Sequence, residues 1–184
     1  MVAIIDYGAG NIFSVQNALN KLGIENKLTN SAKEIESADK LILPGVGAFP
    51  AAMKMLGSFG LVDVLRRNTK PILGICLGMQ MLFSESFEFG RCEGLGLIPG
   101  YVDKIKTKKI LPHMGWNKLE FSNEYVYFVH SYKAFCSKRF IADYCEYDGI
   151  IPAYVRNGNV QGMQFHPEKS GEFGLELLRR FCEL

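Results

Sequence analysis

A cysteine between two glycines is the first feature of this sequence that could do chemistry. The stretch is Gly74-Ile75-Cys76-Leu77-Gly78, and it lies between an apolar run and a helical pattern. A nucleophile at a sharp turn from strand to helix forms a nucleophile elbow, in which flanking glycines let neighbouring backbone approach closely. The elbow would place the thiol at the carboxyl edge of a sheet and at a helix N-terminus, which favours thiolate. Such a pentapeptide also arises by chance around a buried cysteine, so it needs a second feature beside it.

A histidine followed two residues later by a glutamate supplies that second feature. In Phe165-His166-Pro167-Glu168 the proline pushes His166 toward an extended conformation. Side chains two apart in an extended chain point to the same side, so the glutamate can bond one imidazole nitrogen and leave the other for a nucleophile. Alone, this could be a strand-end histidine paired with a surface glutamate. The two motifs together predict a triad: Cys76 as nucleophile, His166 as its base and Glu168 orienting the base.

A glycine-rich turn, Pro44-Gly45-Val46-Gly47, follows an apolar run and could complete the site. Backbone N–H groups of this turn, together with the N–H of Leu77, could stabilise a developing oxyanion. Taken alone, the turn is better explained as a tight connection.

The elements that must position these residues alternate in the first half of the chain. Apolar runs predict strands, and helical spacing of apolar residues predicts helices between them. The predicted strands are residues 2–5, 24–28, 41–43 and 71–75. Helices are predicted at residues 12–22, 51–56 and 61–67, and another is predicted after Cys76. A capping box at residues 31–34 opens a further short helix. This alternation implies a parallel sheet with helices on its faces.

The second half of the chain is richer in aromatic and β-branched residues. It predicts strands at residues 101–105, 116–121, 125–130, 140–147 and 160–165, turns at residues 148–149 and 157–158, and a last helix at residues 171–182. The predicted fold class is α/β, with an open, mostly parallel sheet flanked by helices and an antiparallel portion in the second half. We expect residues 1–184 to form one domain.

Composition excludes several classes of partner. The 184 residues include 21 Lys+Arg and 19 Asp+Glu, which gives a formal net charge of +2. A charge so balanced does not favour a nucleic acid or a membrane surface. The one basic cluster, residues 104–109, is interpreted as a solvated loop between two strands. No apolar run approaches the length of a bilayer span and the start of the chain lacks a signal-peptide pattern, so we expect a cytoplasmic protein.

The sequence predicts neither a metal nor a cofactor. Its five cysteines have no paired CxxC spacing, which indicates neither a disulfide framework nor a zinc site and suits a reducing cytosol. The Gly-Ala-Gly stretch at residues 8–10 begins like a dinucleotide fingerprint, but Phe13 stands where the third glycine should be. The histidines are widely spaced without a metal-ligand motif, and we interpret His113 and His130 as structural.

Beyond the triad, longer stretches of the sequence resemble the class I, or triad-type, glutamine amidotransferases. The similarity is carried by GICLGMQ (residues 74–80), FHPEKSG (165–171), DYGAGN (6–11), LPGVGAF (43–49), PHMGWN (112–117) and YFVHSY (127–132). Within that family the set is most similar to the glutaminase subunits of imidazole glycerol phosphate synthases, and it runs from the first predicted strand to the last predicted helix.

The resemblance implies an activity and a partner. In such enzymes a cysteine thioester forms as glutamine is hydrolysed to glutamate and ammonia. The ammonia passes to a separate (βα)8-barrel cyclase subunit, bound as a heterodimer. That subunit makes imidazole glycerol phosphate and aminoimidazole carboxamide ribotide in histidine biosynthesis. The resemblance implies no metal, no cofactor, no nucleic acid and no membrane.

The resemblance also assigns substrate contacts. It implies that Gln80 and Glu88 contact the substrate glutamine, as does the backbone at Ser131 and Tyr132. Glu85 is an alternative to Glu88, because both lie in the same predicted loop.

It further implies a face toward the barrel formed by Asn11, Trp116, Tyr132 and Lys169. Isolated subunits of this kind are expected to be nearly idle until the barrel binds. A hypothesis for the cause is that the flexible loop at residues 45–47 must turn an N–H inward to complete the oxyanion hole.

Three other interpretations stay open at this stage. A paralogue could deliver ammonia to a different synthase, such as a sugar amidotransferase for surface polysaccharide. The chain could be a catalytically dead interaction or regulatory subunit, although an intact triad argues against it. A cysteine-dependent peptidase or hydrolase on a related fold is the third, but it leaves Gln80 and the stretch PHMGWN without a role.

Overall fold

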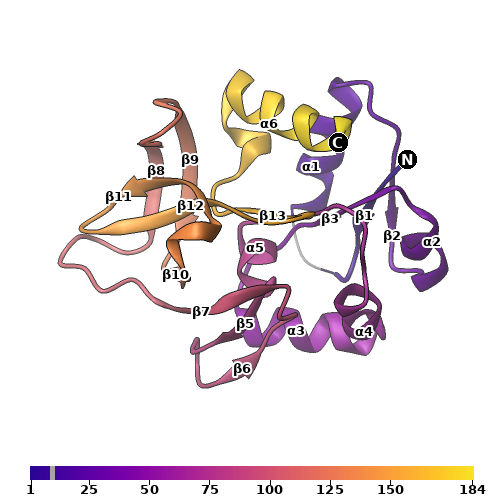
Figure 1. Ribbon diagram of the computed structural model, residues 1–184, viewed down its shortest axis with the longest axis horizontal. Coiled ribbons are helices and arrows are strands. Elements are labelled where there is room, and N and C mark those ends of the chain that lie inside the picture. The colour runs from indigo at the N-terminus through magenta and orange to yellow at the C-terminus, as the bar shows by residue number, and fades with distance from the viewer. Residues whose placement is uncertain (9–10) are drawn as a thin grey trace.

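The computed structural model describes residues 1–8 and 11–184, and a seven-stranded sheet forms its centre (Figure 1). The strand order is β11-β12-β13-β4-β3-β1-β2. Strands β13, β4, β3, β1 and β2 run parallel, while β12 and β11 add an antiparallel edge. The strands are β1 (Val2–Ile5), β2 (Asn26–Thr29), β3 (Lys40–Leu43), β4 (Ile72–Ile75), β11 (Ile141–Glu146), β12 (Ile150–Asn157) and β13 (Val160–Met163). The predicted fold class is confirmed.

Helices cover both faces of this sheet, as Figure 1 shows. One face carries α1 (Ile12–Lys21) and α6 (Gly171–Glu183), and the other carries α2 (Ala32–Ser37), α3 (Phe49–Ser58), α4 (Leu61–Arg66) and α5 (Leu77–Met81). The strand sequences explain why both faces are buried. In β1, Val2 and Ile4 pack into one apolar cluster while Ala3 and Ile5 pack into the other. Successive side chains of a strand point to opposite faces, so an uninterrupted apolar strand needs cover on both sides.

Two smaller sheets extend from the antiparallel side. Strands β10, β7, β5 and β6 form a four-stranded sheet, and β8 and β9 form a hairpin. Their bounds are β5 (Phe83–Ser86), β6 (Cys92–Glu93), β7 (Ile98–Lys104), β8 (His113–Lys118), β9 (Tyr125–His130) and β10 (Tyr132–Phe135). Short 3-10 helices lie at η1 (Lys138–Phe140) and η2 (Pro167–Lys169). The sequence did not predict β5, β6, β10 or β12, which are mostly short or lack regular alternation.

Several predicted details differ from the structure. The strand expected at residues 116–121 lies three residues earlier, as β8, because the chain turns at residues 120–122. The capping box expected at Ser31 and Glu34 is wrong. The N–H of Ser31 donates to Thr29 Oγ1 at 3.0 Å, and Glu34 instead pairs with Lys27 at 2.7 Å. The hairpin turns are confirmed, with positive φ at Asp148 between β11 and β12.

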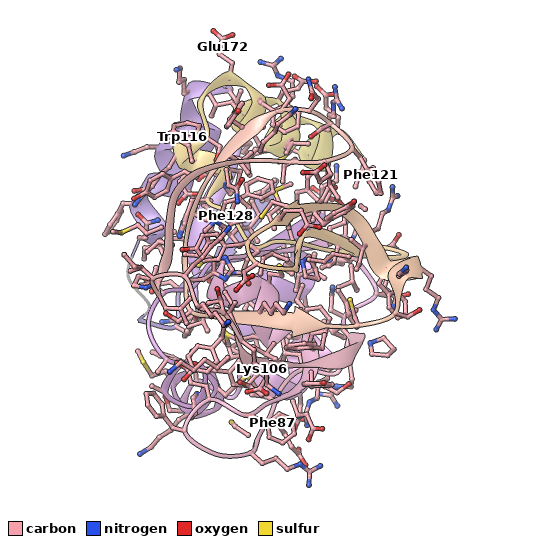
Figure 2. All side chains as sticks on the ribbon, turned by 90° about the vertical axis from the view of Figure 1, so that its left-hand side faces the viewer. Phe87, Lys106, Trp116, Phe121, Phe128 and Glu172 are labelled. Carbon is pink, nitrogen blue, oxygen red and sulfur yellow. The ribbon has the colours of Figure 1, made fainter. Side chains whose placement is uncertain are left out.

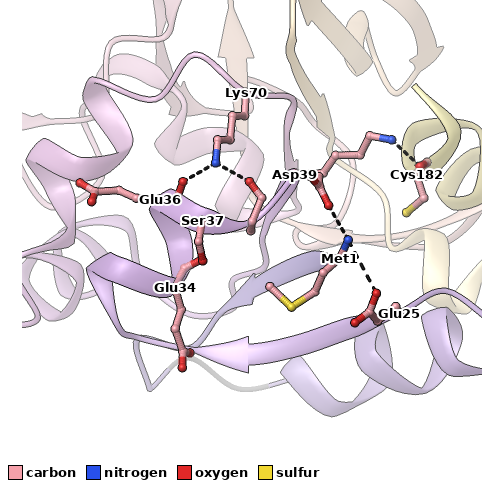
Figure 3. Close-up of polar contacts among 10 residues, drawn as sticks. Met1, Glu25, Glu34, Glu36, Ser37, Asp39, Lys70 and Cys182 are labelled. Atoms are coloured by element: carbon pink, nitrogen blue, oxygen red, sulfur yellow. Dashed lines mark hydrogen bonds and ion pairs between the residues drawn. The ribbon is translucent and has the colours of Figure 1, made fainter.

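Polar contacts fasten the amino-terminal ends of the central strands (Figure 3). The Met1 ammonium lies 2.6 Å from Asp39 and 4.0 Å from Glu25. Lys70 donates to main-chain carbonyls at the end of α2, and Lys40 donates to the carbonyl of Cys182 near the end of α6. These contacts lie at the end of the sheet opposite to the carboxyl ends of the parallel strands. In the described parts of the chain, no helix is long and apolar enough to cross a membrane.

Candidate active site

The backbone at Cys76 has the strained conformation that a nucleophile elbow requires. Its φ is 55° and its ψ is −111°, at the junction of β4 and α5. A Cβ at Gly78 would lie 1.8 Å from the carbonyl oxygen of Leu43, and one at Gly74 would lie 2.6 Å from the carbonyl oxygen of Gly78. Real Cβ atoms do not approach that closely, so both glycines are needed for the helix to pack against β4 and β3. The elbow inferred from the sequence is therefore present.

Strand pairing brings the histidine to this elbow. Strand β13 runs parallel to β4, with Met163 opposite Ile75. The N–H of Cys76 donates to the carbonyl of Met163 at 2.7 Å, just before the chain continues to His166. Two motifs about ninety residues apart in the sequence thus emerge side by side at the carboxyl edge of the sheet.

His166 and Glu168 form a buried pair. The distance from Nδ1 to Glu168 Oε1 is 2.8 Å, and the side chains are 2% and 0% exposed. Because a carboxylate accepts, Nδ1 carries the proton. Nε2 is buried and has no hydrogen-bond partner among the residues that the structure describes. Burial opposes the charged ring, but the neighbouring Cys76 thiol and then Glu168 outweigh it and raise the pKa of His166. The ring is poised to hold a proton beside the sulfur.

A buried serine that sequence reasoning missed fixes the turn carrying this pair. Ser170 Oγ donates to the carbonyl of His166 at 2.6 Å and accepts the N–H of Tyr127 at 3.0 Å. The N–H of His166 donates to the carbonyl of Tyr127 at 2.9 Å. The turn is thereby tied to β9, which holds the imidazole in place.

Asn11, predicted for the partner face, also contacts the triad. Its Nδ2 donates to Glu168 Oε1 at 2.7 Å, so this oxygen accepts from both Asn11 and His166. Asn11 has a φ of 70° immediately before α1. The neighbouring residues 9 and 10 of the stretch DYGAGN lie outside the described residues.

A cavity of about 200 Å³ opens in front of the thiol. It is smaller than the pockets that bind drug-sized ligands, which suits a molecule as small as an amino acid. Its lining includes most of the residues that the sequence and the resemblance put forward, together with Val129 and His130, which were not predicted there. The lining is Val46, Gly47, Cys76, Leu77, Gln80, Glu88, Val129, His130, Ser131, Tyr132 and His166.

Gln80 lines the cavity and donates hydrogen bonds to two neighbouring residues. Its Nε2 donates to the carbonyl of Tyr132 at 3.1 Å and to Oε1 of Gln164 at 3.0 Å. Gln164 is fully buried, was not predicted, and directs its own Nε2 toward Cys76 Sγ at 3.9 Å. Both amide protons of Gln80 are therefore used, which leaves its Oε1 to accept from a ligand.

Glu88 and Glu85 are separated by the structure. Glu88 lines the cavity, is 7% exposed, and accepts the N–H of Phe49 at 2.7 Å, at the start of α3. Glu85 pairs instead with Arg91 at 2.5 Å, at the surface of the small sheet. Only Glu88 can reach a ligand in the cavity.

The predicted oxyanion loop lies over the elbow, but its groups are engaged elsewhere. The N–H of Leu77 donates to the carbonyl of Gly45 at 3.3 Å. The hydroxyl of buried Tyr7 donates to the carbonyl of Pro44 at 2.9 Å. Burial, and then the charge of Cys76, raise the pKa of Tyr7, which keeps it a donor. Gly47, with a φ of 98°, has a conformation that few other residues adopt. In this conformation the N–H of Leu77 is bonded within the site and is not free to stabilise an oxyanion.

The remaining residues of the predicted partner face differ in exposure. Trp116 is 55% exposed and packs edge-on against Tyr127 at 6.2 Å, close to the turn that carries His166. Figure 2 shows Trp116 at the margin of the molecule. Lys169 is exposed, whereas Tyr132 is partly buried against the cavity. Within residues 1–8 and 11–184, no cluster of His, Cys, Asp and Glu could hold a metal ion.

An elbow cysteine, a buried His–Glu pair and a small cavity at the carboxyl edge of a parallel sheet define the class of protein. The chain belongs to the class I glutamine amidotransferase family, whose model, "Glutamine amidotransferase class-I", matches residues 3–184. Solved structures agree on the fold. A structure described as glutamine amidotransferase superposes with a TM-score of 0.82 at 22% identity, covering 99% of this chain and 97% of that one. A glutamine amidotransferase from Thermotoga maritima superposes with a TM-score of 0.64 at 18% identity, covering 99% and 83%.

Sequence relatives narrow the comparison to one kind of subunit. The protein described as imidazole glycerol phosphate synthase subunit HisH from Exiguobacterium sibiricum is 50% identical, over 100% of this chain and 95% of its own. The HisH of Oceanobacillus iheyensis is also 50% identical, over 100% and 99%. The HisH of a Bacillus cereus strain is 49% identical, over 98% and 93%. The recognition drawn from the six sequence stretches is confirmed.

Proposed function

We propose that this chain is the glutaminase subunit of an imidazole glycerol phosphate synthase, and that residues 1–184 act as one glutamine amidotransferase domain. It would convert glutamine and water into glutamate and ammonia for a separate cyclase subunit in histidine biosynthesis. One observation carries the chemistry. A buried imidazole, bonded through Nδ1 to Glu168, has an unpartnered Nε2 and lines the same small cavity as the Cys76 thiol. The full-length similarity to HisH subunits supports the choice of synthase.

The residues divide the reaction between them. The Cys76 sulfur attacks the side-chain amide carbon of glutamine, and His166 passes its proton to the departing nitrogen, which leaves as ammonia. His166, now neutral, takes a proton from water as the water attacks the thioester. Glutamate leaves, and His166 again holds a proton beside the Cys76 sulfur. Glu168 keeps Nδ1 protonated throughout and stabilises the imidazolium.

The cavity can recognise the ends of glutamine. The free Oε1 of Gln80 can accept from the substrate's ammonium group, and the Glu88 carboxylate can pair with the same charge. Backbone groups at Ser131 and Tyr132 line the opposite wall. Polar groups on several sides of so small a space would hold the amide next to the thiol.

The oxyanion loop supports the expectation that the isolated chain is slow. The Leu77 N–H must leave the Gly45 carbonyl before it can stabilise a tetrahedral intermediate. We propose that a (βα)8-barrel cyclase subunit docks as a heterodimer on the face carrying Asn11, Trp116, Tyr132 and Lys169, and that docking releases this loop. Because all five cysteines lie in the described part of the chain as free thiols, a reducing cytoplasm suits the complex.

A single variant tests the proposal. Cys76→Ala should abolish glutamine-dependent synthesis by the complex with the cyclase, while added ammonium still supports synthesis. Survival of glutamine-dependent synthesis in Cys76→Ala would contradict the assigned nucleophile. Wild-type chain that supports no synthesis with the histidine-pathway cyclase, yet binds another synthase, would favour the paralogue that serves a different pathway.

A further inference from the structure

Two histidines outside the triad form a hydrogen-bonded chain whose direction the structure fixes. His130 Nδ1 lies 2.7 Å from the carbonyl oxygen of Tyr132, and His113 Nδ1 lies 2.9 Å from His130 Nε2. At the far end, Asn117 Nδ2 lies 3.2 Å from His113 Nε2. The N–H of Lys118 donates to Asn117 Oδ1 at 2.8 Å, which fixes the orientation of that amide.

Each donor can be assigned by elimination. A carbonyl only accepts, so His130 Nδ1 carries a proton and, in a neutral ring, His130 Nε2 accepts. His113 Nδ1 must then donate to it, and His113 Nε2 accepts from Asn117. Every polar atom of both rings is satisfied when each ring holds its one proton on Nδ1. No other pair of neutral tautomers achieves this.

Both rings are held neutral. Burial lowers the pKa of His130 to about 3, with the charges of His113, His166 and Lys133 acting in the same direction against its bond to Tyr132. Burial, followed by the charge of Lys109, lowers the pKa of His113 to about 4. The rings are 6% and 3% exposed. A proton added to His130 would give two donors facing each other across the 2.9 Å contact, and a proton added to His113 would give two donors across the 3.2 Å contact with Asn117.

The chain of bonds ends at the substrate cavity. His130 closes β9 and Tyr132 opens β10, so Ser131 is the single residue between this strand of the outer hairpin and this strand of the small sheet. The carbonyl of Tyr132 accepts from Gln80 as well as from His130. All four of these residues line the cavity. The shape of this junction therefore depends on the bond from His130, which in turn depends on His113.

The other end of the chain lies on the hairpin that presents Trp116 to solvent. His113 and Asn117 belong to β8, one on either side of Trp116 in sequence. His113 is clamped between the rings of Tyr147, at 4.0 Å, and Phe128, at 4.7 Å. Figure 2 shows Phe128 inside the molecule and Trp116 at its margin. The bonds therefore run from the surface hairpin to the wall of the cavity.

We propose that His113 and His130 are positioning residues whose fixed tautomers set the Ser131–Tyr132 backbone as the binding edge for glutamine. This inference rests on the proposed function. It differs from a packing role for the two rings, because packing needs the shape of the ring and positioning needs the nitrogen atoms. Since glutamine binding is the step affected, a broken chain should raise KM for glutamine more than it lowers kcat.

Variants of His113 in the complex with the cyclase separate the two roles. His113→Phe keeps a ring between Tyr147 and Phe128 but removes the donor, and we expect KM for glutamine to rise about tenfold, the scale of one buried hydrogen bond. His113→Asn keeps an N–H near the position of Nδ1, and KM should return to within about threefold of wild type. Ammonium-dependent synthesis should be unchanged in both. A wild-type KM in His113→Phe, or no rescue by His113→Asn, would overturn the proposal.

Spectroscopy gives a readout that does not depend on a variant folding. In the nitrogen NMR spectrum of the wild-type chain, both rings should show a protonated Nδ1 and an unprotonated Nε2, unchanged from pH 8 to pH 5.5. A protonated Nε2 or a titration in this range would contradict the assignment. If the wild-type complex shows no glutaminase activity while the tautomers are as stated, the proposed function fails and the hydrogen-bonded chain stands.

Discussion

Removing the Asn11 amide tests whether a hydrogen bond from outside the triad helps Glu168 to do its work. Glu168 is fully buried, its Oε1 accepts from His166 at 2.8 Å and from Asn11 at 2.7 Å, and its Oε2 is unpaired within the described residues. In Asn11→Ala the carboxylate loses one of its two donors, and with Asn11 in place its side chain is 0% exposed. A hydrogen bond to a charged group contributes about 1.5–3 kcal/mol.

That magnitude converts directly into a rate. Glu168 acts on the reaction by stabilising and orienting the His166 imidazolium, which gives its proton to the departing nitrogen. If this hydrogen-bond energy is lost from the stabilisation of the transition state, each 1.36 kcal/mol lowers the rate by a factor of ten. We therefore expect kcat to fall by between about tenfold and a hundredfold. The assay is glutamate release by the complex at saturating cyclase, with the Kd for the cyclase measured separately. Asn17→Ala, at an exposed position of the same helix, is the matched control and should leave kcat unchanged.

Asn11 was first expected at the partner face, and the same experiment distinguishes the two roles. A residue that acts only by docking would change the Kd for the cyclase and leave kcat at saturation intact. If Asn11→Ala raises Kd but keeps the wild-type kcat, the reasoning from the Glu168 contact is refuted. Ammonium-dependent synthesis should be unaffected in either case, because the proposed cyclase partner would take added ammonia without the glutaminase site.

Two further predictions concern stability. Gly78→Ala should lower the free energy of unfolding by about 3 kcal/mol or more, because its Cβ would lie 1.8 Å from a β3 carbonyl oxygen. Denaturant unfolding should show the matched control Gly57→Ala unchanged or slightly more stable, since its Cβ meets no described atom within 4 Å. Acidification should destabilise the chain below pH 6.5, because His113 and His130 have lowered pKa values and the unfolded state binds their protons first. At pH 5 the loss is about 2 kcal/mol for each histidine. The raised pKa of His166 adds stability that is complete below pH 6.5 and is lost at higher pH, so it does not mask this slope. An unfolding free energy that stays flat from pH 6.5 to pH 5, measured by urea titration, would count against both neutral rings.

Local chemistry explains which parts could be predicted from the sequence. The elbow depends on five consecutive residues, and the glycines around Cys76 are needed for contacts within one strand–turn–helix unit. The His-Pro-Glu segment is equally local, because the geometry of extended chain puts both side chains on one side. The parallel sheet could be predicted from the alternation of strands and helices alone.

The missed features all depend on contacts between distant segments. Ser170 matters because of Tyr127, and Gln164 because of Gln80 and Cys76, which are separated from it by more than eighty residues. The short strands of the small sheet are held by pairing with one another rather than by their own propensity. The histidines were interpreted as structural because spacing reveals metal sites but not a hydrogen-bonded chain between neutral rings.

The proposed restraint of the oxyanion loop in the isolated chain requires more than one bond. The bond from the Leu77 N–H to the Gly45 carbonyl is 3.3 Å long and is worth about 1 kcal/mol net. Alone, it would leave more than a tenth of the molecules with the loop released, and a partner could then activate the chain by less than about tenfold. A larger activation needs a second restraint, and the Tyr7 hydroxyl bonded to the Pro44 carbonyl is placed to supply it.

Tyr7→Phe removes that restraint and keeps the buried ring. We expect glutaminase activity without the cyclase to rise several-fold, because the loop is freed to turn an N–H toward the substrate. Activity at saturating cyclase should stay near the wild-type rate, so the ratio of the two rates falls. The measurement is glutamate release with and without the cyclase. The thermal midpoint identifies any general loss of folding, for which Leu65→Val, at a buried position of α4 in the same apolar cluster, is a control. An unchanged ratio in Tyr7→Phe would mean that the Pro44 contact does not hold the loop, and that the restraint lies in the packing of Gly45 against α5.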